Sequence, residues 1–514
     1  MPDFTYPLNG GLNLVDTSTK TDNADFRKLQ NFISRHKQVE AFPGSQRYNT
    51  TALSKPPTWA TRYYGITASG ERVKKAFCFS DGAIYAGNDV TGALTSVQSG
   101  FSTKNPQPDS ITLQVGDRSR LYFFSGNDIP YYHDGDAGNT WYKSGMLKSD
   151  GTSYKPVQGE EHLQRLFTFE ANSSDLLYSK TADYENLTDS SDAGLIVIRK
   201  IEDSVIRRVV LLGDYLFIFK SDSIHVLEGR TPTTFRMTMI TDKFGLAGKN
   251  AIYKVGTAYV FVNSHDNEVY SFGGTEQSIK LMSRKLGFAK ILNHTKTDRI
   301  CMTEHDNLCR ISFWHREQLP GNMYNSFEAV FPTDEMGQEG PKWCLSKGAN
   351  ISCYSRWDEQ GEDTLVTGRS DVGCLMYHYR GHNWDTTPME YQMRLADSVA
   401  DEGMNVRVDD IWIDGDPQQT KECFLRLYLD ARFEDSIYSD QEVSMDTETR
   451  QIAVMSFPIT NMFKTWIKPL SAYSKGNSVA PEIYGKVDEL NLVIRSIKIR
   501  YHIVDKVRSY LVGG

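Results

Sequence analysis

Short runs in which apolar and polar residues alternate recur along the first three quarters of the chain. Each is followed by a polar turn and a second alternating run, as in residues 75–79, the turn Ser80-Asp81-Gly82 and residues 83–86. Alternation with a period of two is typical of β-strands, and two such runs around a polar turn predict a β-hairpin. Seven hairpins are predicted, with turns centred near residues 82, 127, 173, 222, 266, 306 and 371.

The spacing of these turns predicts a repeated architecture. The first six turns lie 40–49 residues apart, and the longer last interval holds an extra predicted hairpin around residues 347–349. A strand repeat of about 40–50 residues is the period of a β-propeller blade. We therefore predict an all-β fold in which residues 58–385 form a six- or seven-bladed β-propeller. Two unrelated all-β domains with ordinary hairpins are the alternative.

The two flanking regions differ from the repeats. Residues 1–57 are rich in turn residues and predict an N-terminal arm, with a short amphipathic helix at 23–32. Residues 386–514 predict a C-terminal β-sandwich-like domain with longer strands. In its last strand, 493–503, Ile497, Ile499 and Tyr501 alternate with an outer basic face; the strands are expected at 389–395, 406–414, 423–429, 451–457 and 493–503.

Composition excludes several classes of protein. The 514 residues carry a net charge of −8, which argues against a general nucleic-acid binder. Seven scattered cysteines without a Cys-x-x-Cys spacing favour buried reduced thiols over disulfides or metal ligation. The N-terminus lacks an apolar signal region, and the longest apolar stretch, 209–219, is far too short to span a membrane. A soluble protein made in a reducing cytosol is expected.

Several short motifs carry a family resemblance. Gly10, Gly11, Leu12 and Asn13, followed by Asn31 and then by Pro43 and Gly44, resemble the N-terminal signature of tail hub or nozzle proteins of short-tailed bacteriophages. These are also described as tail tubular or packaged-DNA stabilization proteins. The signature's arginine is missing, because Phe42 precedes Pro43. Further similar stretches, such as 215–229, extend the resemblance over residues 8–275.

The resemblance implies a structural virion protein rather than an enzyme. Such hubs are β-propellers with an added β domain, and six copies usually form a ring below the portal and its adaptor. The ring retains packaged double-stranded DNA, conducts it during ejection without sequence-specific contacts, and docks tail fibres or spikes. The resemblance also implies a homo-oligomer, most often a hexamer, that is assembled in the host cytoplasm and lies in the virion tail. It implies no membrane span, cofactor, metal or catalytic residue.

The ring needs a contact surface on each copy. The candidates are the arm, residues 1–57, and the strand 493–503, where Lys498 and Arg500 are expected to face acids elsewhere. Removing residues 1–44 is expected to weaken the ring and leave the propeller folded. A small propeller's own hole is filled or narrowed by side chains, so the DNA conduit must lie between subunits. Six copies would carry a charge of about −48, which repels DNA from the wall.

A propeller glycosidase, similar to sialidases, is the alternative function, and a carbohydrate-binding adhesin is a third. Residues 134–141 nearly match the Asp box of sialidases, which is a structural turn in those families. Glu160-Glu161, or Glu359 with Glu362, would have to supply two carboxylates about 5–10 Å apart across a cleft. The clusters Arg72, Lys74 and Lys75, and Arg199, Lys200, Arg207 and Arg208, are interpreted as solvated strand faces. His265-Asp266-Asn267 and His305-Asp306-Asn307 are interpreted as turns.

Overall fold

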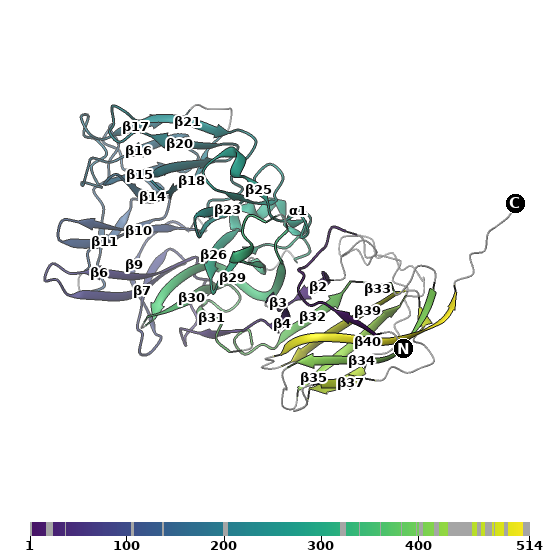
Figure 1. Cartoon of the computed structure of the whole chain (residues 1–514). Helices are drawn as coiled ribbons and strands as arrows, with labels where there is room; N and C mark the ends of the chain where they lie inside the picture. Colours follow the sequence, from purple (N-terminus) through teal and green to yellow (C-terminus); the bar gives the residue numbers. More distant parts are fainter. Residues whose placement is uncertain are drawn as a thin grey trace.

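The computed structural model is almost entirely β-structure and has two parts, a large propeller and a smaller sandwich (Figure 1). In the propeller and the segment before it, it describes residues 3–16, 24–35, 37–103, 107–135, 138–198, 204–318, 325–338, 340–359, 361–381 and 383–396. In the rest of the chain it describes 398–399, 404–415, 421–429, 455–459, 464–467, 475–476, 478–487 and 492–506. The described helices are short: α1 (Phe288–Ile291) and three 3-10 segments, at Glu276–Ser278, His294–Arg299 and Thr333–Glu335.

Five four-stranded antiparallel sheets follow one another along the chain and form the first five blades. Each sheet runs from its first to its fourth strand without a crossover, as expected for propeller blades. Their strands are β6 (Trp59–Ile66), β7 (Arg72–Ser80), β8 (Ala83–Gly87), β9 (Leu94–Ser99); β10 (Asp109–Val115), β11 (Arg118–Phe124), β12 (Tyr131–His133), β13 (Trp141–Lys143); β14 (Pro156–His162), β15 (Arg165–Glu170), β16 (Asp175–Tyr178), β17 (Gly194–Val197); β18 (Ile206–Leu212), β19 (Tyr215–Lys220), β20 (Ile224–Glu228), β21 (Arg236–Thr241); β22 (Ile252–Val255), β23 (Ala258–Val262), β24 (Val269–Phe272) and β25 (Lys280–Leu281).

Blades 6 and 7 share one long strand. Blade 6 contains β26 (Cys301–His305), β27 (Leu308–Phe313), β28 (Asn325–Pro332) and the first half of β29 (Cys344–Glu359). Blade 7 contains the second half of β29 with β30 (Glu362–Arg369), β31 (Cys374–His378) and β5 (Ser45–Arg47). The extra hairpin expected around residues 347–349 is therefore wrong. Gly348 and Asn350 have positive φ, and with the register shift between Ile351 and Cys353 they let β29 pass from one blade to the next without reversing.

The seven blades close into a ring. Strand β29 of blade 7 packs beside β6 of blade 1, and the other packed pairs include β10 with β14, β14 with β18, and β22 with β26. Aromatic pairs join neighbouring blades, such as Trp59 with Phe123, whose ring centroids lie 4.9 Å apart. The N-terminal β5 supplies the outer strand of the last blade, so a segment that precedes the first blade in the sequence completes the seventh. This settles the predicted six or seven blades at seven.

The C-terminal sandwich consists of two sheets. One contains β3 (Phe32–Arg35), β4 (Gln38–Ala41), β40 (Val493–Lys506), β34 (Met404–Gly415) and β37 (Lys464–Ile467), with β1 (Asp3–Tyr6) on β40 and β38 (Lys475–Gly476) on β34. The other contains β2 (Phe26–Gln30), β32 (Met389–Leu395), β39 (Ser478–Val487), β35 (Lys421–Leu429) and β36 (Met455–Ile459), with β33 (Ser398–Val399) on β39. The predicted C-terminal strands are confirmed, except that residues 451–454 lie outside the described residues. Ile497 and Ile499 are buried, as their alternation predicted.

The first 57 residues belong to both parts of the molecule. Strands β1, β3 and β4 join one sandwich sheet, β2 joins the other, and β5 joins the propeller. The helix expected at 23–32 is wrong, because β2 and β3 occupy this segment. Phe26, Leu29 and Phe32 are buried as strand residues, since long-range pairing with β32 overrides a weak helical pattern. Figure 1 shows β2, β3 and β4 between the propeller and the sandwich.

Candidate functional site

One candidate site is the mouth of the propeller axis, where the inner strands of the blades begin. Arg208 of blade 4 donates to Asp109 of blade 2 at 2.7 Å and to Asn250, just before blade 5, at 3.1 Å. The pair with Asp109 reaches past blade 3, which lies between blades 2 and 4. Glu160 of blade 3 lies near it, and burial raises the pKa of this carboxyl to about 7, against the attraction of Arg208. Oppositely charged side chains therefore meet across this mouth.

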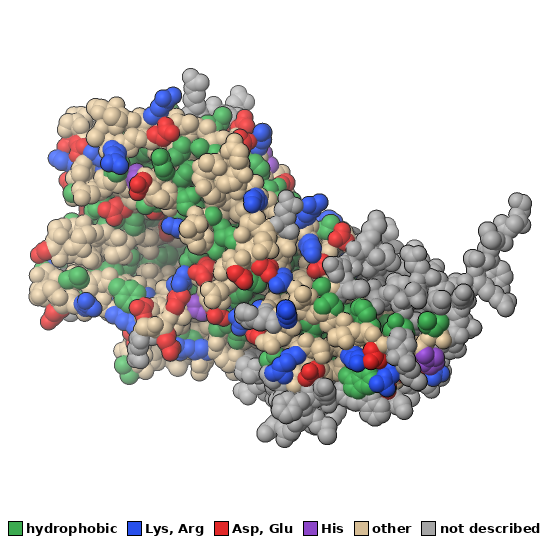
Figure 2. Space-filling model, viewed as in Figure 1, with side chains coloured by type: hydrophobic (Ala, Val, Ile, Leu, Met, Phe, Trp, Pro, Cys, Tyr) green, Lys and Arg blue, Asp and Glu red, His purple; other side chains and the backbone are tan. Residues whose placement is uncertain are grey.

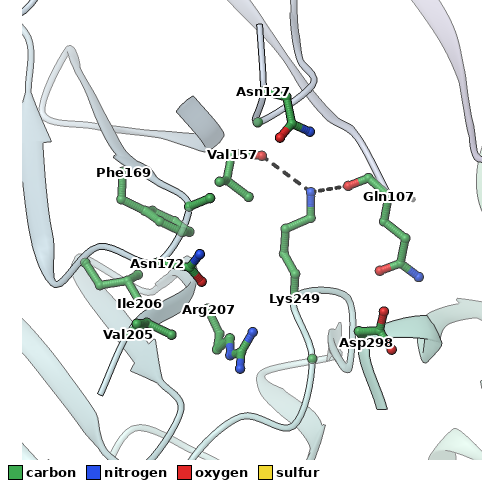
Figure 3. Close-up of a pocket in the computed structure, with 13 residues that line it drawn as sticks. Gln107, Asn127, Val157, Phe169, Asn172, Val205, Ile206, Arg207, Lys249 and Asp298 are labelled. Atoms are coloured by element: carbon green, nitrogen blue, oxygen red, sulfur yellow. Dashed lines mark hydrogen bonds between the residues drawn. The ribbon is translucent and has the colours of Figure 1, made fainter. Parts of the chain in front are cut away.

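Lys249 connects several blades at the same mouth of the axis (Figure 3). Its ammonium donates to the backbone carbonyl of Gln107 and, at 3.4 Å, to that of Val157. The side-chain amide of Gln107 donates in turn to the carbonyl of Arg299 at 3.2 Å. These residues precede or begin blades 5, 2, 3 and 6. Burial lowers the pKa of Lys249 to about 8, so the ammonium stays protonated at neutral pH. Side chains cross the axis here and narrow it, as expected for a small propeller.

A cavity of about 250 Å³ lies beside Lys249. Two β-bulges shape it, because the pairing register of β14 shifts at Val157 and that of β18 shifts at Arg207. A bulge turns a side chain or carbonyl out of its regular direction. The Arg207 side chain lines this cavity, and its buried Nε has no hydrogen-bond partner in the described part of the chain. Sequence reasoning interpreted Arg207 and Arg208 as solvated, and that is wrong for Arg208; Arg199 and Lys200 lie outside the described residues.

The second candidate site is the junction between propeller and sandwich, and it contains the signature residues. A Cβ on Gly10 would lie 2.0 Å from the Ala24 carbonyl oxygen, and one on Gly11 would lie 2.5 Å from Lys342 Cα. The Leu12 amide donates to the Trp343 carbonyl at 2.7 Å, and its side chain is buried. Glycine is therefore required where this segment passes between β2 and the propeller.

Asn13 continues the junction. Its buried side chain donates to Asp25 at 3.2 Å and accepts from the Asp16 amide at 3.1 Å. Asp25 also accepts from the Lys285 ammonium, 2.9 Å away in the propeller. Asp25 is buried, so this ion pair and its hydrogen bonds satisfy a carboxylate that would otherwise be costly to bury.

Asn31, Pro43 and Gly44 complete the junction. Asn31 is fully buried with a φ of 56°, a conformation that asparagine tolerates better than most residues. Its side-chain amide contacts both parts of the molecule, through Lys347 and Glu390. A Cβ on Gly44 would lie 2.0 Å from the Asn383 carbonyl oxygen, and Pro43 is half-buried beside it. The structure thus brings all the signature residues to one interface.

Lys498 and Arg500 form ion pairs within the same chain. Lys498 lies 2.6 Å from Asp3 of β1, and Arg500 lies 3.5 Å from Asp3 and 3.4 Å from Asp410. Both cations also lie over the Trp412 ring. Lys498 and Arg500 were expected to face acids on another copy. The acids that they contact lie within the protomer, because β1 pairs with β40 and brings Asp3 next to them.

The motifs considered for enzymatic function take structural positions. The Asp-box-like segment joins β12 to β13, where Asp134 pairs with Arg118 and Arg120 and Trp141 is buried. Glu161 accepts a hydrogen bond from the Tyr184 hydroxyl at 2.6 Å. Glu362 lies at the exposed turn between β29 and β30, and the Glu359 side chain lies outside the described residues. Asn267 and Asn307 have positive φ, which confirms the two turns.

The remaining expectations concern the cysteines, metal-ligand groups and helices of the described residues. The six described cysteines are buried and free, as predicted, while the Cys423 side chain lies outside the described part. Within the described residues, no group of three His, Cys, Asp or Glu side chains is placed to hold a metal ion. None of the helices described is long and apolar enough to cross a membrane. Figure 2 shows acidic and basic side chains interspersed over the propeller face in view.

Comparisons with known proteins give only remote similarities. No family model and no curated protein matches the chain. Similar solved structures include the extracellular domain of a one-component system of B. thetaiotaomicron, at 10% identity and a TM-score of 0.43 over 94% of this chain and 63% of that one. PorZ, a surface component of the type-IX secretion system of Porphyromonas gingivalis, matches at 12% identity and a TM-score of 0.37, over 70% of this chain and 44% of that one.

An exo-β-1,3-galactanase of Phanerochaete chrysosporium matches at 8% identity and a TM-score of 0.25, over 97% of this chain and all of that one. The chain spans less than two thirds of the length of the first two proteins. At these identities and scores, the similarities assign no function.

Proposed function

We propose that the chain is a structural subunit of the tail of a short-tailed bacteriophage, a hub that assembles into a ring around the DNA path. The proposal rests on the signature residues together with the place they occupy. Gly10, Gly11, Asn13, Asn31 and Gly44 all lie in the buried junction between propeller and sandwich. They fix the angle between two domains, which a building block of a symmetric ring requires.

The continuity of the core supports the same proposal. A single hydrophobic cluster extends from blades 4 to 6 through Phe288 and Trp343 into the sandwich residues Phe26 and Ile497. Two domains joined by a shared core move as one body, whereas domains joined by a small polar interface move relative to each other. A hub under the pressure of packaged DNA needs the first arrangement.

The narrowed axis supports a conduit between subunits. Ties such as Lys249 to Gln107 cross the mouth of the propeller axis. Duplex DNA is about 20 Å wide, since its major groove alone is about 12 Å wide, and it cannot pass through a propeller axis that side chains fill. DNA would therefore pass through the centre of a ring of copies, and most often six copies form such a ring in the proteins that this one resembles.

The partners follow from the same assignment. The ring would lie in the virion tail, below the portal or adaptor, and would carry fibres or spikes on its outside. Turnover of a glycan is not expected, because the Asp-box-like segment and Glu161 are held in structural contacts.

Cryo-electron microscopy of intact particles tests the proposal. We expect a ring of this chain around the tail axis, and its position as a capsid decoration or a distal receptor-binding trimer would contradict the hub assignment. Deleting residues 1–44 is not a clean test of ring assembly. The deletion removes β1 to β4 and exposes the sandwich core, although β5 remains to close the propeller. Charge reversal of an exposed patch, found from the ring structure, is the better variant.

A further inference from the structure

The cavity beside Lys249 is lined by polar and charged groups that the hub function does not use. Its described lining includes Arg207, Lys249, Asn127, Asn172 and Asp298. The buried Nε of Arg207 has no hydrogen-bond partner in the described part of the chain, while the side chain as a whole is half-buried. A buried N–H donor without a partner is costly, so a ligand that accepts a hydrogen bond from this Nε–H would bind favourably.

The β-bulges in β14 and β18 direct the Val157 carbonyl and the Arg207 side chain toward the cavity. Arg207 is the residue at which β18 departs from its register with β19, and Val157 holds the same place in β14 with β15. In a regular strand the Arg207 side chain would point to the face of the sheet opposite to that of its two neighbours. The bulge changes the direction in which this side chain points. The Val157 carbonyl accepts from Lys249 at 3.4 Å, which holds the ammonium at the cavity wall. Figure 3 shows Lys249 and Arg207 on neighbouring sides of the cavity, with Asn172 beside Arg207.

The chemistry of the lining identifies the kind of ligand. The described lining residues include two cations, Arg207 and Lys249, and one acid, Asp298, a balance that favours an anion. The amides of Asn127 and Asn172 and the Asp298 carboxylate suit hydroxyl groups, and Phe169 with Ile206 offers an apolar wall for C–H groups. Asp298 would repel a phosphate that filled the cavity. The volume, about 250 Å³, is below the roughly 300–1,000 Å³ of pockets for drug-sized ligands, so one sugar ring is the appropriate size.

From this arrangement we propose that the cavity at the axis of blades 2 to 5 binds the carboxylate of a sugar acid through Arg207, with Lys249 adding positive charge and Asn172 and Asp298 holding its hydroxyls. The proposal concerns binding, without cleavage, and stands apart from ring assembly. An acidic sugar is a component of many bacterial surface polysaccharides, so such a site would give the protein a contact with a cell surface.

Isothermal titration calorimetry of the full chain tests this, with glucuronate and galacturonate as probes and glucose, acetate and phosphate as comparisons. We expect a dissociation constant on the order of 1 mM for the sugar acids and binding at least about tenfold weaker for the other three. Arg207→Met should weaken sugar-acid binding by about tenfold, and Asn172→Gly should weaken it by about threefold. Glycine keeps the positive φ of position 172, so that variant removes the amide without backbone strain.

Arg236→Met is the matched control, because Arg236 is an exposed arginine on the outer strand of blade 4. Its binding should equal that of the unmodified chain, and thermal unfolding should show that each variant is folded. The proposal is overturned by a folded chain that binds neither sugar acid at about 10 mM. It is equally overturned if acetate or phosphate binds as tightly as glucuronate, or if Arg207→Met and Arg236→Met bind alike.

Discussion

Asn31 and Lys347 bond to each other twice, since the Lys347 amide donates to Asn31 Oδ1 at 2.8 Å and Asn31 Nδ2 donates to the Lys347 carbonyl at 3.2 Å. The same Nδ2 donates to the Glu390 carbonyl at 2.8 Å. Lys347 belongs to β29 of the propeller and Glu390 to β32 of the sandwich. One buried side chain therefore joins the two parts of the molecule through main-chain groups.

Asn31→Ala should lower the free energy of unfolding by about 1–3 kcal/mol, because it leaves the Lys347 amide without its partner and removes the two hydrogen bonds that Asn31 Nδ2 donates. Urea unfolding followed by tryptophan fluorescence measures the change. Asn267→Ala is the control, since Asn267 has a similar φ of 59° in a turn of the propeller surface. Equal losses in the two variants would mean that backbone conformation, rather than the hydrogen bonds, accounts for the effect.

Gly11→Ala should destabilise the junction strongly, because the new methyl group would lie 2.5 Å from Lys342 Cα and 2.7 Å from the Trp343 amide nitrogen. Backbone atoms cannot move aside as a flexible side chain does, and overpacking costs about 1–3 kcal/mol or more. Differential scanning calorimetry should show a lower unfolding temperature. Gly138→Ala, whose Cβ would meet only Thr140 at 3.8 Å, should leave that temperature unchanged.

Arg310 and Glu328 form a fully buried ion pair in blade 6, with 3.2 Å between Nη1 and Oε2. Burial raises the pKa of Glu328, but Arg310 and the hydrogen bonds from neighbours outweigh it and hold the pKa at about 2. Glu328→Gln should cost about 3–5 kcal/mol of stability, since it leaves the Arg310 charge buried without its counter-ion.

The double variant Arg310→Met with Glu328→Leu should cost much less than Glu328→Gln, because it removes both charges and fills the space with apolar groups. Chemical denaturation of both variants makes the comparison. A double variant as unstable as the single one would show that the wider network, including the 2.7 Å hydrogen bond from the Tyr354 hydroxyl, is needed as a unit.

Acid should destabilise the propeller through His225 and His315. Burial lowers the pKa of each to about 4, while in the unfolded chain both protonate near 6.5. The unfolded state therefore binds more protons between pH 6.5 and 4, and stability is lost as pH falls through this window. Each histidine should account for about 2 kcal/mol at pH 5. Replacing both by Gln should flatten the pH dependence measured by urea unfolding from pH 7 to 5.

Glu160 should act in the opposite direction. Its pKa is raised to about 7 by burial, against 4.5 for an ordinary glutamate, so its stabilising effect is present below pH 4.5 and is lost as pH rises through 7. Glu160→Gln should raise stability relative to the unmodified chain by about 1–3 kcal/mol more at pH 8 than at pH 5. A difference that does not change with pH would show that Glu160 remains ionised in the folded protein.

The hairpins of the propeller follow from local patterns in the amino-acid sequence. In the first five blades, the predicted hairpins are the second and third strands, where a run of buried residues, such as those around Phe77 and Phe123, is followed by a polar turn. The last hairpin, at 364–377, is also formed. Local pattern and turn chemistry suffice for these elements, because both strands and their connection lie within about twenty residues. The junction residues were also singled out from sequence, through Gly10, Gly11 and Asn31.

Tertiary structure decided what depends on residues far apart in the chain. The helix predicted at 23–32 became β2 because its partner strand, β32, lies more than 350 residues away, and no local pattern reports such a partner. The axis mouth is the same kind of case. Arg208 meets Asp109 and Lys249 meets Gln107 only after the ring closes, and the closing strand β5 comes from the other end of the propeller sequence. Closure of the ring is a property of all seven blades together, and this is why the sequence identified the repeats but not the residues that their assembly brings together.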